Sequence, residues 1–357
     1  MTIKQKLEVL ATEKNTPCVT ISLNTHRTHP ENARDVIQLK NLITEAEERV
    51  LNEFDKRSVA SLLKNLSEIK IDKNYNLDSL HIFISNDTKE IIKTPWSTRK
   101  NRVQIADSFG VRSLIKSLNR SEEYYILLLS QGGVTLYNAT NDGITSEIQN
   151  SDFPFSENPH YVMDSEKLSD TKITDNMIRE YFNNVDKAVV RVYNEKALPC
   201  VIICTEDNYS RYMQIADRPT IYLGYANINY NKIDAHHIAK QAWEIVKVLI
   251  DNRITKAINE IKETVGKGKV LTDLQEIYQA AIDGRGDLLI VHENFAQPVF
   301  MTGDRTFNLV TDKTKPNVID DITSNIAWEV MSKKGRVFFS TQDEIKDFGK
   351  IVLKTRY

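Results

Sequence analysis

VTISLNTHRTHPENARDVIQLKNLITEAEERVLNEF, residues 19–54, is the stretch of sequence that decides the fold. It opens with Val19, Ile21 and Leu23 alternating with polar residues, which is the period of a strand with one buried face. Residues 30–32, Pro-Glu-Asn, are start signals for a helix, and the apolar residues after them recur every three or four positions. This strand followed by a helix indicates an α/β fold.

The loop between that strand and that helix holds His26, Arg27 and His29. Loops at this place in α/β proteins commonly meet ligands, and side chains rich in hydrogen-bond donors suit phosphate. The alternative interpretation is a solvated connection without a ligand.

Composition places the chain among ordinary soluble globular proteins. It has 357 residues, enough for two or three domains, with 41% hydrophobic and 27% charged residues. No apolar run is long enough to span a membrane, and the N-terminus lacks the apolar core of a signal peptide. Three cysteines in a chain of this size favour a reducing compartment, so we expect a cytoplasmic protein.

Charge is distributed unevenly along the chain. The net charge is −2 and the isoelectric point is near 6.4, so no global field attracts nucleic acid. Between positions 89 and 120, however, basic residues outnumber acidic ones, and this local excess is suited to phosphate contacts. The alternative is a solvated basic face. The basic residues within this stretch are Lys93, Arg99, Lys100, Arg102, Arg112 and Lys116.

The order of predicted elements suggests three α/β domains, at 1–120, 121–264 and 265–357. In the first, we expect a hairpin at 79–93, then a polar loop, then a helix capped by Ser108. In the second, a strand meander at 124–149 precedes an exposed loop at 151–175 and a helix–strand unit that ends in a long helix at about 234–264. The third alternates helices and strands to the end of the chain.

Spacing and residue type indicate no active site. Cys200 and Cys204 share one face of a predicted strand and are interpreted as core residues. His236 and His237 are adjacent on a helix and so point in different directions, which leaves one of them to cover apolar surface. No phosphate-binding loop or nucleophile elbow occurs, and we expect no catalytic activity, cofactor or metal.

Five segments carry a family resemblance when they are taken in order: 19–50, 123–148, 185–213, 270–295 and 335–357. They resemble the archaeo-eukaryotic type of class-one translation termination factor and its relative Pelota, most closely a bacterial branch of that group. The resemblance implies a first domain that reaches the ribosomal decoding site and a middle domain that reaches the peptidyl-transferase centre. It also implies a third α/β/α domain like the ribosomal L7Ae proteins, which usually engages a translational GTPase such as the tRNA-delivering elongation factor.

Two motifs of that family have no counterpart here. The region that corresponds to its Asn-Ile-Lys-Ser motif, around residues 31–43, lacks it. The loop that corresponds to its Gly-Gly-Gln motif, residues 156–176, contains no glycine, so its backbone cannot approach a reacting ester in the same way. Pelota also lacks both motifs and acts by occupying an empty decoding site.

The resemblance therefore predicts a non-catalytic factor that binds the ribosomal aminoacyl site, in rescue of stalled ribosomes or in hibernation. Two alternatives stay open: a hydrolase or nuclease on the same scaffold, acting on RNA or an aminoacyl ester, and a stress-response module that binds proteins. The residues expected to contact ribosomal RNA are Arg27, His29, Arg34, Lys40, Arg99, Lys100 and Arg102. Those expected in the loop towards the peptidyl-transferase centre are His160, Tyr161, Lys167 and Lys172.

Overall fold

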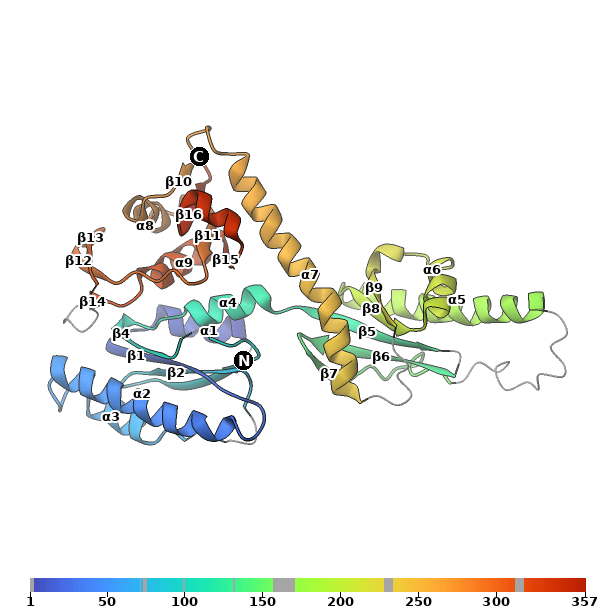
Figure 1. The fold of residues 1–357 in the computed structure, drawn as a ribbon, viewed down its shortest axis with the longest axis horizontal. Helices are drawn as coiled ribbons and strands as arrows, with labels where there is room; N and C mark the ends of the chain where they lie inside the picture. The colour runs from blue at the N-terminus through green and yellow to red at the C-terminus, as the bar shows by residue number, and fades with distance from the viewer. Residues whose placement is uncertain are drawn as a thin grey trace. The chain divides into compact units, whose positions relative to one another are not determined.

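The computed structural model divides into two compact units, Met1–Arg120 with Ile254–Tyr357, and Ser121–Arg253 (Figure 1). Helices and strands occur in both units, so the predicted α/β fold class is confirmed. This grouping does not test the predicted division into three domains, which stays a prediction. The structure describes residues 3–70, 72, 76–98, 100–130, 132–156, 171–227, 234–311 and 318–357, with the backbone alone at 171–174 and 344.

The first sheet is antiparallel, with strand order β3-β2-β1-β4. The apolar residues Val19, Ile21 and Leu23 of β1 pack in one cluster with the apolar faces of α2 and α3, as the sequence predicted. Figure 1 shows these two helices on one side of the sheet and α1 and α4 on the other. The elements are α1 (Ile3–Thr12), β1 (Lys14–Asn24), α2 (Asn32–Glu53), α3 (Ala60–Ser67), β2 (Ser79–Ile84), β3 (Lys89–Thr94), β4 (Arg102–Ser108) and α4 (Arg112–Arg120).

The second face of this sheet is also buried, which corrects the expectation that its polar residues face solvent. Thr20 and Ser22 of β1 are 1% and 3% exposed. The Thr20 hydroxyl accepts a hydrogen bond from the amide of Gly110, 2.9 Å away, and the Ser22 hydroxyl contacts His81. Polar groups on a covered face need such partners.

One apolar core joins α1 and α4 to the C-terminal part of the same unit. It contains Leu7 and Leu114 from the first 120 residues together with Leu289 and Ile326 from the last hundred. Here the sheets have the orders β10-β16-β11-β15 and β13-β12-β14, and β11 pairs with β15 in parallel. The elements are β10 (Val270–Leu271), α8 (Leu274–Ile282), β11 (Gly286–His292), β12 (Val299–Gly303), β13 (Thr306–Leu309), β14 (Val318–Ile319), α9 (Ile322–Ser332), β15 (Arg336–Ser340), a 3-10 helix (Asp343–Phe348) and β16 (Ile351–Thr355).

The other unit is built on a five-stranded sheet of order β7-β6-β5-β8-β9. The predicted meander forms its antiparallel half, and β8 and β9 add parallel strands. Cys200 and Cys204 are buried in its core, as predicted. The elements are β5 (Glu123–Ser130), β6 (Gly133–Thr140), β7 (Gly143–Glu147), α5 (Thr171–Glu195), β8 (Cys200–Cys204), α6 (Glu206–Met213), a 3-10 helix (Pro219–Ile221) and β9 (Tyr222–Asn227). The long helix α7 (Ala235–Lys262) belongs to this unit up to Arg253 and to the first unit from Ile254.

Several expectations about elements are wrong. Ser108 ends strand β4 instead of capping a helix, and β4 itself was not predicted. The segment from 151 is not uniformly exposed, because Phe153 is buried and Phe155 pairs with Val134 across an isolated bridge. None of the described helices is long and apolar enough to cross a membrane.

Candidate nucleic-acid interface

A row of buried polar side chains crosses the face of the first sheet that is turned towards α4. His81 lies between two serines, with Nδ1 3.1 Å from Ser22 Oγ and Nε2 3.0 Å from Ser79 Oγ. Burial lowers the pKa of His81 to about 3, and the positive charges of Arg102 and Lys116 act in the same direction. The imidazole is therefore neutral at physiological pH and serves as a hydrogen-bonding partner rather than as a cation.

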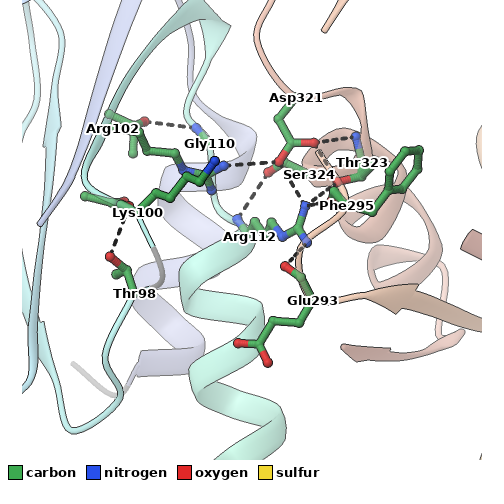
Figure 2. Close-up of polar contacts among 12 residues, drawn as sticks. Thr98, Lys100, Arg102, Gly110, Arg112, Glu293, Phe295, Asp321, Thr323 and Ser324 are labelled. Atoms are coloured by element: carbon green, nitrogen blue, oxygen red, sulfur yellow. Dashed lines mark hydrogen bonds and ion pairs between the residues drawn. The ribbon is translucent and has the colours of Figure 1, made fainter. Parts of the chain in front are cut away.

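Helix α4 carries a buried arginine that binds the C-terminal segment (Figure 2). Arg112 Nη1 donates to Asp321 Oδ2 at 3.1 Å and to Thr323 Oγ1 at 2.7 Å, and Nη2 donates to the carbonyl of Glu293 at 2.9 Å. Arg102 reaches the same Asp321 oxygen at 3.5 Å. Burial lowers the pKa of Arg112, whereas Asp321 opposes this effect. For Asp321, burial acts to raise the pKa, but Arg112 and Arg102 together hold it below its ordinary value.

One carboxylate holds the next two cations of the same helix. Lys116 Nζ lies 2.6 Å from Glu293 Oε1, and Arg120 Nη2 lies 2.9 Å from Glu293 Oε2. Burial lowers the pKa of Lys116 to about 8, although Glu293 favours the charged form. Because Arg112, Lys116 and Arg120 are four residues apart, they lie along one side of α4.

These groups border a cavity of about 730 Å³, within the range of small-molecule sites. Its lining comes from the polar row of the sheet, the basic side of α4, the segment after β3, and the loop after β11. Glu293 is its one carboxylate among the described residues. The cations of the lining are Lys100, Arg102, Arg112, Lys116 and Arg120. An excess of positive charge thus converges here in a chain whose net charge is −2.

The segment after β3 connects the cavity to helix α2. Thr98 Oγ1 donates to the carbonyl of Lys100 at 3.1 Å (Figure 2). Asn101 Oδ1 accepts a hydrogen bond from the amide of Asn24 at 2.8 Å, and its Nδ2 donates to Gln38 of α2. Arg34 is one helical turn before Gln38 and lies on the same side of α2.

The structure brings two of the predicted RNA-contacting residues together at the cavity, Lys100 and Arg102. Arg27 is held elsewhere, with Nε 2.8 Å and Nη2 3.1 Å from the two carboxylate oxygens of Asp78. Three others are exposed and do not line the cavity: His29, Arg34 and Lys40. The remaining predicted residues lie outside the described part of the chain: Arg99, His160, Tyr161, Lys167 and the side chain of Lys172.

Sequence reasoning missed the other half of this site. Arg120 could have been found, because it continues the four-residue spacing of Arg112 and Lys116. Glu293 and Asp321 had no local signal, since they lie 177 and 209 residues from Lys116 and Arg112 respectively. Much of the basic excess expected to contact phosphates is therefore used within the protein, in ion pairs with the C-terminal segment.

Other reactive side chains form no comparable site. Among the described residues, no group of three or more His, Cys, Asp or Glu side chains could hold a metal ion. His236 and His237 are both exposed, which corrects the expectation that one of them covers apolar surface. In the other unit, the buried Asp186 accepts a hydrogen bond from the hydroxyl of Tyr222 at 2.5 Å and one from the amide of Asp217 at 2.9 Å. Both oxygens of this carboxylate are thus occupied by the protein itself.

Comparison with solved structures finds proteins of the translation apparatus. The chain is similar to the archaeal translation termination factor aRF1 at 13% identity and a TM-score of 0.25, over 99% of this chain and 97% of that chain. Pelota from Archaeoglobus fulgidus shares 11% identity at a TM-score of 0.38, over 100% and 92% of the two chains. Dom34 from S. cerevisiae shares 13% identity at a TM-score of 0.34, over 78% and 74%. No curated protein matches the sequence.

The family comparison rests on sequence and is more specific. The model of bacterial archaeo-eukaryotic release factor family 3 matches residues 123–285. This range contains the meander at 123–148 and the helix–strand–helix segment at 185–213, two of the five segments on which the resemblance was drawn. Residues 123–285 are therefore similar to bacterial archaeo-eukaryotic release factor family 3, in agreement with the family resemblance seen in the sequence.

Proposed function

We propose that this protein is a translation factor that binds the ribosome, with the basic cavity and the exposed basic residues near it in contact with ribosomal RNA. The observation that carries the proposal is the convergence of five cations on a cavity whose described lining holds one carboxylate, in a chain with a negative net charge. Phosphates supply most of the affinity in protein–RNA contacts, and lysine and arginine are their usual partners. The family match supplies the translational context.

The mode of action that we propose is occupation of the aminoacyl site without peptide release. It rests on the sequence, which carries neither Asn-Ile-Lys-Ser in the first domain nor glycine in the loop at 156–176. A protein that fills this site without cleaving an ester serves either to rescue stalled ribosomes or to protect idle ones. A translational GTPase is a fitting partner in the first case.

Within the RNA-contacting set, Lys100 and Arg34 are the residues that we expect to matter most. Both side chains are exposed, and the segment that holds Lys100 is bound to α2 through Asn101 and Gln38. Arg27 is expected to contribute less, because its guanidinium is already engaged by Asp78.

Cosedimentation with purified ribosomes tests the proposal. We expect binding at about 50 mM salt that weakens steeply by about 200 mM, since binding to phosphates releases counterions. The double variant Arg34→Glu/Lys100→Glu should lose binding, whereas Lys56→Glu/Lys187→Glu, which reverses the charge of two exposed lysines outside the cavity, should retain it. Absence of binding to both vacant and stalled ribosomes, with and without elongation factor, would contradict the proposal.

The hydrolase alternative required His160 and Asp164 to converge with His236 or His237. The first two lie outside the described residues, and the other two are exposed at the start of α7. No observation on the described residues favours this alternative. The protein-binding alternative assumed the loss of a basic surface, and the cation-lined cavity argues against that assumption.

A further inference from the structure

The cavity beside α4 has an aromatic wall as well as a basic one. Trp96 lines it, and the guanidinium carbon of Arg120 lies 5.7 Å from the centre of the Trp96 ring. Arg120 is also bound to Glu293, so its position over the ring is fixed from two sides. An indole supported by a cation is a suitable stacking surface for a planar ring.

The cations of the lining differ in how far the protein already neutralises them. Arg112 is buried and bound by Asp321, while Lys116 and Arg120 share Glu293. Lys100 is exposed and forms no ion pair within the described residues, and Arg102 reaches Asp321 only at 3.5 Å. Positive charge is therefore left over at the side of the cavity that Lys100 and Arg102 form.

A third observation points to a polar ligand. The hydroxyl oxygen of Ser113, which also lines the cavity, is buried and has no hydrogen-bond partner within the described part of the chain. A buried hydroxyl without a partner costs free energy, and a ligand that reaches it would remove that cost.

We propose that this cavity binds one nucleoside phosphate, with its base against Trp96, its phosphate at Lys100 and Arg102, and a hydroxyl or ring nitrogen within reach of Ser113. A bare phosphate ion would leave the aromatic wall unused, and an apolar ligand would leave the cations unused. The inference rests on the proposed function, because the nucleotide is either part of ribosomal RNA or a free nucleotide that meets the same basic surface.

Isothermal titration calorimetry on the full chain tests the proposal. The probes are the four nucleoside monophosphates, adenosine, inorganic phosphate and the RNA pentamer AAAAA. We expect binding of a nucleotide probe that is at least about tenfold tighter than that of adenosine or inorganic phosphate, because the base and the phosphate each contribute. Trp96→Leu and Lys100→Ala should each weaken it about tenfold or more, and Trp96→Phe should weaken it less than Trp96→Leu because an aromatic ring remains. The exposed control Lys56→Ala should leave it within about twofold.

The probes also separate the two sources of the nucleotide. Monophosphates that bind with this dependence on Trp96 and Lys100 indicate a free nucleotide, whereas binding of AAAAA alone indicates a nucleotide of RNA. The proposal is overturned if no nucleotide probe binds, if inorganic phosphate binds as tightly as the nucleotides, or if the Trp96→Leu and Lys100→Ala variants bind like the wild type.

Ribosome cosedimentation of the same variants keeps the two proposals distinct. If Trp96→Leu loses nucleotide binding but binds ribosomes like the wild type, the cavity binds a free nucleotide and not a nucleotide of ribosomal RNA. Nucleotide binding in a protein that binds no ribosome would overturn the proposed function and support the cavity as a nucleotide site.

Discussion

Arg112 is the residue on which the junction between α4 and the C-terminal segment depends most. Its guanidinium is buried against Asp321, which is itself buried, and it also donates hydrogen bonds to the carbonyls of His292 and Glu293. Arg112→Met removes the cation and leaves Asp321 uncompensated except by the more distant Arg102. We expect the free energy of unfolding, measured by urea denaturation, to fall by about 3–5 kcal/mol.

The matched control for this prediction is Arg191→Met. Arg191 pairs with Asp152 at 2.9 Å, but its side chain is 57% exposed. Surface pairs of this kind contribute only about 0–1 kcal/mol, so the control should stay close to the wild type. Equal effects of the two substitutions would contradict the role assigned to Arg112.

The buried His81 is expected to make the protein less stable at low pH. Its folded pKa is lowered to about 3 by burial, whereas the unfolded side chain takes up a proton near 6.5. The unfolded state therefore binds more protons between these two values, and the stability that the neutral His81 contributes is lost as pH falls from 6.5 towards 3. The free energy of unfolding, measured between pH 6.5 and 3, should therefore fall less in His81→Gln than in the wild type.

The exposed His29 provides the comparison for this acid effect. His29→Gln should follow the wild type at every pH, because this substitution leaves the buried His81 in place. A wild-type curve that runs parallel to that of His81→Gln would show that the buried imidazole is not the source of the acid sensitivity.

At the scale of elements, α4 and the loop after β11 set the charge of the cavity. Glu293 binds Lys116 and Arg120, so Glu293→Gln removes the carboxylate of the cavity lining and leaves Arg120 available to phosphate, while it preserves the size of the side chain. We expect about tenfold tighter binding of single-stranded RNA at low salt, together with a steeper dependence on salt. Fluorescence anisotropy with a labelled oligonucleotide measures both quantities.

Glu263→Gln is the control for Glu293→Gln, since Glu263 is exposed and does not line the cavity. Its removal changes the net charge by the same amount. Equal gains in the two variants would mean that RNA responds to total charge rather than to this cavity.

Elements with a long apolar period were predictable from sequence, and those hidden by polar neighbours were not. The alternation in β1 and the three- and four-residue spacing in α2 both led to the correct elements. Strand β4 also has Val103 and Ile105 buried, but it is short and directly follows a polar loop, and it was not predicted. The polar half of β1 was assigned to solvent because nothing in a local period shows that α1 and α4 cover it.

For the whole molecule, the sequence indicated the basic half of the candidate site and missed its acidic half. A local excess of basic residues is visible directly in the sequence, and it includes Lys100, Arg102, Arg112 and Lys116. Their partners lie in a segment about two hundred residues later and become visible only once the last hundred residues fold against the first. How much of that charge remains for RNA is therefore a property of the tertiary structure.

The central claim is that this protein occupies the aminoacyl site of the ribosome through its basic first 120 residues. Electron cryomicroscopy of the full chain bound to purified ribosomes tests it most directly. We predict density for residues 1–120 in the decoding region of the small subunit, with Lys100 and Arg34 against ribosomal RNA. An empty aminoacyl site, with the protein absent or bound elsewhere on the ribosome, would contradict the claim.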